Sequence, residues 1–180
     1  METLYLVQHD QFSTSVVPAL DPEDVFYNIE SNIQSDGSRS TDILKMSEDA
    51  EKAGLQIASV SYFDWNDTVV KFGAKSFDLN AFLRRRNIYS NSRVFVGPDG
   101  QTYKWSIRGK GLELHHADSR ELIVRSHPPK EGTLFSKQRH ASLEIAREHV
   151  TDDSKMLDAI IITYCIMQHK LDERLQYRYP

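Results

Sequence analysis

The sequence predicts a mainly β protein in which an antiparallel β-barrel is wrapped around one buried, hydrophobic C-terminal helix. About nine or ten short segments rich in β-branched and aromatic residues are separated by turn signals, which is typical of antiparallel barrels. The run Met156–Met167 (MLDAIIITYCIM) is apolar or aromatic apart from Asp158 and Thr163, so a helix formed by it needs burial on every side. A closed barrel filled by this helix gives the strands a core and shields the helix from water on every side.

The central helix is expected over residues 153–175. Its apolar run falls short of the roughly 20 apolar residues that a bilayer span needs, so it predicts a core helix and no transmembrane segment. Asp152 and Asp153 are candidate N-terminal capping residues, and Lys170 and Arg174 place positive charge at the C-terminal end. The single cysteine, Cys165, excludes an internal disulfide and is interpreted as a small buried hydrophobe.

In the first half of the chain, residues 1–23 are expected to be an irregular N-terminal segment in which Leu4–Val7 can form a short opening strand. The stretch 8–23 is polar and carries Pro18 and Pro22, which favours an irregular connection. Two hairpins are predicted next from alternation and turn residues: Val25–Ile29 with Thr41–Met46 across Asp36-Gly37, and Leu55–Phe63 with Thr68–Phe72 across residues 64–67.

The clearest local signal is a hairpin at Arg93–Val96 and Thr102–Ile107, joined by Gly97-Pro98-Asp99-Gly100. Proline has its φ already set for the turn, and Gly100 accepts a left-handed conformation. Tyr103, Trp105 and Ile107 then share one face of the returning strand. Before this hairpin, helical spacing predicts a short helix or turn over Phe77–Arg86.

The remaining segments continue the strand pattern up to the helix. Leu112 and Leu114 alternate with polar residues, and Leu122–Val124 forms another short strand. Residues 127–140, with Pro128 and Pro129, are expected to be an exposed loop. Ala141–Val150 is expected to be the last strand, with Leu143 and Ile145 pointing inward. The whole chain, 1–180, is expected to be a single domain.

The segments RVFVGPDGQTYKW, LELHHADSRELIVR and SLEI, leading into MLDAIIITYCIMQHKLDERL, resemble a family of uncharacterised single-domain proteins of mushroom-forming fungi. Those domains are similar to the tubby-like fold shared with the plant LURP-one-related proteins and the phospholipid scramblases. The resemblance covers about Val25 to Leu175. It implies a tubby-like β-barrel around a hydrophobic C-terminal helix, and it implies no established activity.

Composition favours an intracellular binding module. The net charge of −4 and the pI near 6.0 argue against a general nucleic-acid-binding surface. The N-terminus lacks the features of a secretory signal, so we expect a cytoplasmic protein that can act at the periphery of a membrane. The chain contains no GxGxxG, Walker A, GxSxG or kinase motif, which shifts the expectation away from an enzyme, and no cofactor is expected.

The candidate ligand is an anionic phospholipid head group, with another protein as the alternative partner. Near an anionic membrane each cation is worth about 1 kcal/mol, and tubby domains, which the chain resembles in its expected fold, bind phosphoinositides. The competing interpretation of the basic residues is a solvent-exposed run of positive charge that is balanced by the 26 acidic residues of the chain. The basic patch comprises Arg84, Arg85, Arg86, Lys104, Arg108 and Lys110.

Two other function classes stay open. One is an enzyme with a pocket at the barrel mouth near Asp158 and five histidines of the last third of the chain. Adjacent residues on a strand point to opposite faces, so His115 and His116 cannot share a metal ion unless the strand bulges there, and no metal site is predicted. The other class is a structural or self-associating protein. The five histidines are His115, His116, His127, His140 and His149.

Overall fold

The structure is a computed structural model that describes residues 1–8, 13–18, 24–36, 38–46, 54–62, 68–85, 90–130, 139–150 and 154–176. The chain divides into two compact units. The N-terminal unit is Thr3–Phe82, and the C-terminal unit consists of Met1–Glu2 and Leu83–Pro180. The sequence-based expectation of one domain over 1–180 stays a prediction.

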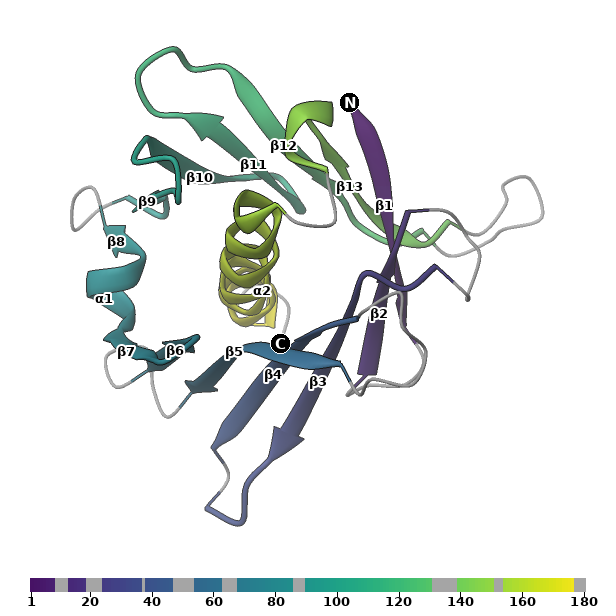
Figure 1. The fold of residues 1–180 in the computed structure, drawn as a ribbon, viewed down its shortest axis with the longest axis vertical. Helices are drawn as coiled ribbons and strands as arrows, with labels where there is room; N and C mark the ends of the chain where they lie inside the picture. The colour runs from purple at the N-terminus through teal and green to yellow at the C-terminus, as the bar shows by residue number, and fades with distance from the viewer. Residues whose placement is uncertain are drawn as a thin grey trace. The chain divides into compact units, whose positions relative to one another are not determined.

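The N-terminal unit is an antiparallel meander in which each strand pairs with the next along the chain (Figure 1). The predicted hairpins are confirmed as the pairs β3–β4 and β5–β6. Residues 64–67 of the second turn lie outside the described part of the chain. The elements are β1 (Glu2–Gln8), β2 (Ser13–Val17), β3 (Tyr27–Ile33), β4 (Arg39–Lys45), β5 (Leu55–Tyr62), β6 (Val69–Phe72), β7 (Lys75–Asp78) and α1 (Leu79–Phe82).

The opening strand expected at Leu4–Val7 is confirmed as part of Glu2–Gln8, whereas the irregular connection expected over residues 8–23 is wrong for Ser13–Val17, which is a strand. β2 pairs with β1 on one side and β3 on the other, so its backbone groups are satisfied despite the polar composition. The hydroxyl of Ser15 donates to Oδ1 of Asn28 at 2.8 Å, and Val16 and Val17 are buried. Polar side chains that find partners on the neighbouring strand are therefore compatible with a central strand.

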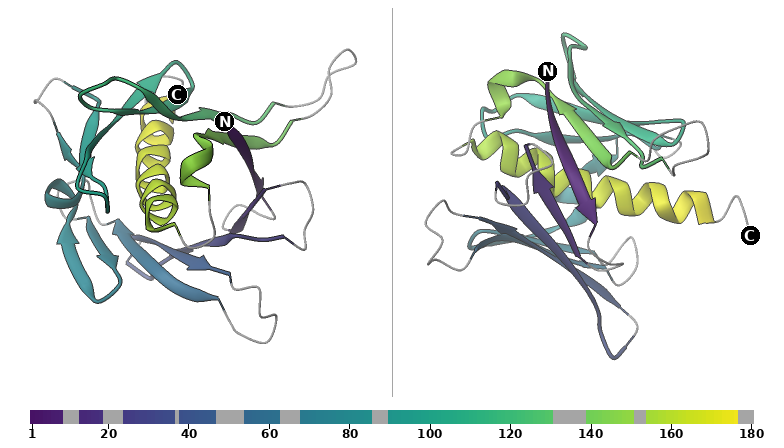
Figure 2. Two further views of the ribbon diagram at one scale, coloured as in Figure 1. Left: turned by 45° about the horizontal axis from the view of Figure 1, so that its top comes forward. Right: turned by 90° about the vertical axis from the view of Figure 1, so that its right-hand side faces the viewer.

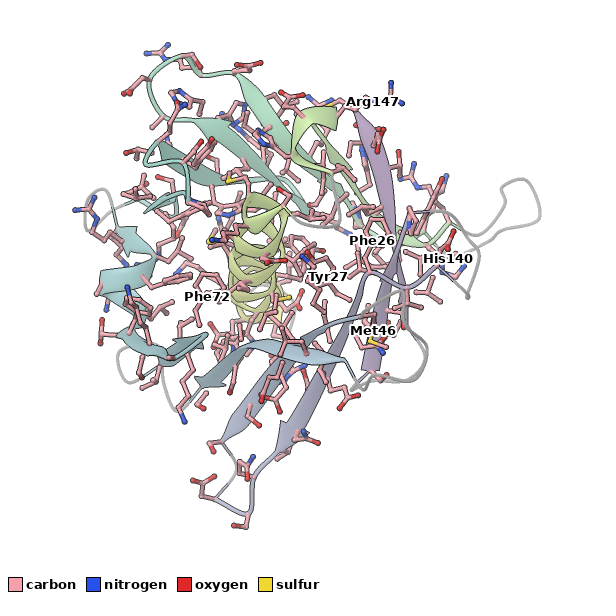
Figure 3. All side chains as sticks on the ribbon, in the orientation of Figure 1. Phe26, Tyr27, Met46, Phe72, His140 and Arg147 are labelled. Atoms are coloured by element: carbon pink, nitrogen blue, oxygen red, sulfur yellow. The ribbon has the colours of Figure 1, made fainter. Side chains whose placement is uncertain are left out.

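The C-terminal unit is a second antiparallel meander followed by the long helix α2 (Figure 1). Its strands are ordered β13-β12-β11-β10-β9-β8. Arg147, labelled in Figure 3, donates from Nε to Oε1 of Glu2 at 2.7 Å and ties Glu2 to this unit. The elements are β8 (Arg84–Arg85), β9 (Arg93–Val96), β10 (Thr102–Arg108), β11 (Gly111–His116), β12 (Leu122–His127), β13 (Ala141–Ile145), the 3-10 helix η1 (Arg147–His149) and α2 (Lys155–Gln176).

Two predicted boundaries need correction. The short helix or turn expected over Phe77–Arg86 is a single helical turn at Leu79–Phe82, because Phe77 and Asp78 belong to β7 and Arg84 and Arg85 form β8. Asp78 caps this single turn by accepting the N–H of Asn80 at 2.7 Å. The strand expected over Ala141–Val150 ends at Ile145, where the chain turns into η1.

The β9–β10 hairpin confirms its prediction. Gly100 has a φ of +79°, the left-handed conformation that the turn requires. Asp99 stabilises the turn by accepting the N–H of Gln101 at 3.0 Å and the hydroxyl of Tyr103 at 2.6 Å. Tyr103 and Trp105 are buried on one face of β10, while Lys104 on the other face is partly exposed.

Helix α2 begins and ends within two residues of its expected bounds, and Figure 2 shows it as one straight rod. In the run Met156–Met167 every residue is buried except Asp158 and Cys165, which are partly exposed. Ser154 caps the start, because its Oγ accepts the N–H of Leu157 at 3.1 Å. The expected caps Asp152 and Asp153 lie outside the described residues. Among the helices of the described ranges, none is long and apolar enough to cross a bilayer.

The fold class is thus mainly β and antiparallel, with one long C-terminal helix. Thirteen strands are present in the described part of the chain. In neither unit do the described strands close on themselves, since β7 and β8 each form an edge with a partner on one side only. Closure into a barrel around α2 is not confirmed and stays a prediction.

Candidate functional site

The sheet of the C-terminal unit has one side that faces α2 and one that faces outward. Directly opposite residues on neighbouring strands share a face, and successive residues alternate. Trp105, which is fully buried, donates its indole N–H to Oγ1 of Thr163 on α2 at 2.9 Å, so its row is the helix-facing one. The helix-facing row is Arg85, Arg93, Trp105 and Leu114, and the outward row is Arg84, Val94, Lys104 and His115.

Arg93 is the exceptional residue of the helix-facing row, because its exposed fraction is 0%. Its Nη1 lies 3.5 Å from the carbonyl oxygen of Leu83, to which it donates. Burial, with the neighbouring positive charge of Arg85 as the second cause, lowers the pKa of the Arg93 guanidinium to about 10. Arg93 therefore remains a cation at neutral pH, at a position where charge is costly.

Arg85 lies directly opposite Arg93 and is exposed. The exposure arises because β8 is only two residues long and is the edge strand of this meander. The pair Arg85–Arg93 thus places one accessible guanidinium next to one buried guanidinium on the same face. The pair places two positive charges side by side at the edge of this meander.

Lys170 is brought to this pair by the geometry of α2. It follows Thr163 by seven positions, which puts both on one stripe of the helix about 10.5 Å apart along the axis. The row from Trp105 to Arg85 crosses two strand spacings, roughly 9.6 Å. Lys170 and Arg85 therefore lie at similar distances from the Trp105–Thr163 hydrogen bond, and the charges of Arg93 and Arg85 both act on Lys170.

The surroundings of Lys170 lower the pKa of its ammonium group. Burial lowers the pKa of Lys170 to about 8, and the charges of Arg93 and Arg85 act in the same direction. Arg174 also lowers this pKa, while Glu173 raises it. We call Arg85, Arg93 and Lys170 the cationic cluster. Its members come from β8, β9 and α2, and together they can donate several charge-assisted hydrogen bonds to an anion.

The structure separates the basic patch expected from the sequence. Arg84 and Lys104 share the outward face, on either side of Val94, and Arg85 belongs to the opposite face. Lys110 is exposed in the turn after β10, whereas Lys104 lies four residues, about 13 Å of strand, before the end of β10 at Arg108. The Nε of Arg108 lies 3.7 Å from Oε2 of Glu113, so its charge is partly compensated. Arg86 lies outside the described residues.

The histidines are distributed over several elements. The β11–β12 pairing shifts register between Leu114 and His115, so a bulge does exist at this point. The two side chains nevertheless have different partners. The Nε2 of His115 lies 3.8 Å from Oε2 of Glu113. The Nδ1 of His116 accepts the N–H of Ser119 at 3.2 Å, and its Nε2 is hydrogen-bonded to Oε1 of Gln101.

The other three histidines lie elsewhere in the C-terminal unit. The Nε2 of His127 lies 3.2 Å from Oε2 of Glu144. His140 is exposed just before β13 (Figure 3), and His149 is the last residue of η1. In the portion of the chain that the structure describes, no three His, Cys, Asp or Glu side chains gather in a way that could hold a metal ion.

Helix α2 carries two further groups that could take part in chemistry, Asp158 and Cys165. Asp158 is partly exposed in the first turn, where its N–H donates to the carbonyl oxygen of Ser154 at 3.2 Å. Burial raises the pKa of the Cys165 thiol to about 12. A thiol with that pKa is protonated at neutral pH, which makes it a poor nucleophile.

Two members of the cationic cluster, Arg93 and Lys170, were not among the residues predicted for the site. Two signals in the sequence point to them. The register of the Gly97–Gly100 hairpin places Arg93 opposite Trp105, on the buried face. The spacing of seven between Thr163 and Lys170 extends the buried stripe of α2 to a charged residue.

Comparison with known proteins identifies one family. No curated protein and no solved structure matches the chain. The model of a family described as "Family of unknown function (DUF6593)" matches residues 10–173. That range contains all three residues of the cationic cluster and most of the strands of both units. The chain therefore belongs to the DUF6593 family of unknown function.

Proposed function

We propose that this chain is a non-enzymatic binding module whose ligand is anionic and is held by the cationic cluster. The observation that carries the proposal is the convergence of Arg85, Arg93 and Lys170 from three elements around a fully buried guanidinium. Guanidinium and ammonium groups gathered in this way can donate several charge-assisted hydrogen bonds to one anion.

The anionic group can belong either to a lipid head group or to a soluble molecule. Arg85 is exposed at the edge strand, so a ligand can reach the cluster from that side. Arg84 and Lys104 on the outward face add positive charge near the same edge, which favours approach to an anionic membrane surface. We place the protein in the cytoplasm, where it can associate reversibly with such a surface.

The proposal includes a tubby-like arrangement in which the strands close around α2. Its support is the burial of the apolar run Met156–Met167 on nearly all sides, together with the antiparallel meander in each unit. A helix with no polar face has no stable place in water. The resemblance of the C-terminal segments to tubby-like domains of fungi points to the same arrangement.

The test combines a soluble and a membrane measurement on the full chain. Thermal unfolding is followed with inorganic phosphate, and flotation is measured with vesicles of phosphatidylcholine alone or mixed with phosphatidic acid. A ligand at 100 times its Kd stabilises the folded state by about 2.7 kcal/mol, which is readily seen as a rise in Tm. We expect a response in at least one arm.

A matched pair of variants locates the binding site. Arg85→Gln with Lys170→Gln removes two charges from the cluster, and Arg108→Gln with Lys110→Gln removes two charges from the β10–β11 turn. We expect the first pair to abolish the response and the second pair to retain it. Absence of any response to either probe contradicts the proposal, and so does an equal loss in both pairs.

A further inference from the structure

Charge is divided unequally between the two units of the chain. The sequence of the N-terminal unit, residues 3–82, contains 13 acidic and five basic residues, which give it a net charge of −8. The C-terminal unit contains 13 acidic and 17 basic residues, which give it a net charge of +4. The net charge of the whole chain, −4, is therefore the sum of two units of opposite sign.

Part of the negative charge of the N-terminal unit lies on one face of its sheet. Glu30 on β3 and Asp42 on β4, which are adjacent strands in Figure 1, lie directly opposite each other. Ile43, the next residue of β4, is fully buried, so the two carboxylates lie on the opposite side of the sheet, where Glu30 is exposed and Asp42 partly exposed. The charged residues of this side on β3 to β7, which we call the acidic face, are Glu30, Asp42, Lys71 and Asp78.

The outward side of the sheet in the C-terminal unit carries an excess of positive charge. The side chains of Arg108 and Arg125 are 70% and 47% exposed, whereas the side chain of Glu113 between them is only 21% exposed. The Oε1 of Glu113 lies 3.3 Å from Nε of Arg125, so the less exposed carboxylate is already paired within the sheet. The charged residues of this side on β8 to β13, which we call the basic face, are Arg84, Lys104, Arg108, Glu113, Arg125 and Glu144.

We propose that the protein associates with itself, and that the acidic face of one copy docks on the basic face of a second copy. With histidines neutral, the described residues give the acidic face a net charge of −2 and the basic face a net charge of +2, so each face neutralises the other. Each copy contributes two different surfaces, which makes the contact heterologous. This association goes beyond the proposed anion binding, because Arg85 and Arg93 of the cationic cluster belong to the helix-facing row and not to the basic face.

A contact between exposed charges depends strongly on ionic strength. The Debye length is roughly 30 Å at about 0.01 M salt and roughly 3 Å at about 1 M salt, so attraction between the faces is screened in the second condition. Burial of apolar surface does not weaken in this way as salt is added. We therefore expect an association of the full chain that is seen at low salt and lost at high salt, by sedimentation velocity over a series of protein concentrations.

Two charge-reversal variants test which surfaces meet. Glu30→Lys with Asp42→Lys makes the acidic face positive, so both faces of that variant are positive. Lys104→Glu with Arg108→Glu makes the basic face negative, so both faces of that variant are negative. We expect each variant alone to raise the Kd of self-association at least about tenfold, because attraction is replaced by repulsion. An equimolar mixture of the two should associate again, because each face then meets a face of opposite sign.

The matched control is Asp118→Lys with Glu121→Lys, which changes the net charge by the same amount as Glu30→Lys with Asp42→Lys but in the turn between β11 and β12. We expect this control to associate like the wild type. Circular dichroism and thermal unfolding show that each variant is folded.

The proposal is overturned by a wild-type chain that stays monomeric at low salt, a result that needs no variant. It is also overturned by association that persists at high salt or in either charge-reversal variant alone, and by two folded variants whose mixture does not associate. If a monomeric wild type binds vesicles that contain phosphatidic acid and the variant Lys104→Glu with Arg108→Glu does not, the basic face docks on a membrane and not on a second copy.

Discussion

The indole N–H of Trp105 donates to Oγ1 of Thr163 across 2.9 Å, and this hydrogen bond joins strand β10 to helix α2 in the interior of the C-terminal unit. The hydroxyl of Thr163 in turn donates to the carbonyl oxygen of Ala159 at 2.7 Å. Both polar groups are thus satisfied in an apolar setting. The contact sets which side of α2 faces β10, and Lys170 lies on the same stripe of the helix as Thr163.

Removing the acceptor from this contact should destabilise the fold. Thr163→Val preserves the shape of the side chain but leaves the buried indole N–H without its acceptor, which costs about 1–3 kcal/mol. Urea denaturation of the two single variants Thr163→Val and Trp105→Phe and of the double variant measures the coupling energy, and the other effects of each substitution cancel in this cycle. We expect coupling of about 1 kcal/mol. Strictly additive losses would show that the hydrogen bond contributes nothing.

Lys170→Met should stabilise the protein at neutral pH while abolishing anion binding. Lys170 has a pKa of about 8 in the folded chain and an ordinary value of 10.5 when unfolded. Below pH 8 the folded state holds a disfavoured charge, and between these values the unfolded state binds more protons, so the free energy of unfolding rises with pH. The advantage of the Met variant is on the order of 1 kcal/mol at pH 7 after solvent screening, and it disappears near pH 10.5.

This pH dependence is measured as the difference between wild type and variant by urea denaturation at a series of pH values. The raised pKa of Cys165 makes stability fall between about pH 9 and pH 12, which is the opposite direction, but it affects both proteins and cancels in the difference. A Met variant that is less stable than wild type at pH 7 would show that Lys170 is a stabilising structural residue.

Gly97→Ala should destabilise the β9–β10 hairpin by about 1–3 kcal/mol through overpacking. An added Cβ would lie 2.7 Å from Cε2 of Tyr103, and the Tyr103 ring is held by stacking on Phe95 and by the edge contact with His116. Gly109→Ala is the matched control.

At Gly109 the φ is +62° and an added Cβ meets nothing within 4 Å, so Ala there costs only the left-handed backbone, about 1–2 kcal/mol. Thermal unfolding of both variants compares the two costs. A Gly97→Ala variant as stable as wild type would mean that the Tyr103 ring is not fixed in place.

The sequence predicted those elements whose signal is local. The alternation of Tyr103 and Trp105 and the preset φ of the proline in the turn specify the β9–β10 hairpin without reference to the rest of the chain. The uniform apolar character of Met156–Met167 specifies α2 in the same way. Strand β2 was missed because Ser13, Thr14 and Ser15 have a weak strand signal, and pairing with strands on both sides overrides that signal.

The candidate site was only partly accessible from the sequence. The run Arg84 to Arg86 stands out as a cluster of charge, but alternation along β8 sends Arg84 and Arg85 to opposite faces, which counting charges cannot show. The burial of Arg93 could not be predicted, because it is the first residue of an apolar strand and a charged residue at a strand end is usually exposed. Its meaning depends on its register with Trp105 and on the contact of Trp105 with Thr163, which are tertiary facts.

The most direct test of the cationic cluster as an anion site is the pKa of Lys170, measured by NMR of the protein carrying 13C-labelled lysine, without and with saturating inorganic phosphate. The Lys170→Met variant assigns the signal. The account predicts a pKa of about 8 without the anion, because burial and two arginines disfavour the charge, and a clear rise towards the ordinary lysine value when the anion is bound. A Lys170 that titrates near 10.5 in the free protein, and is unchanged by the anion, would contradict it.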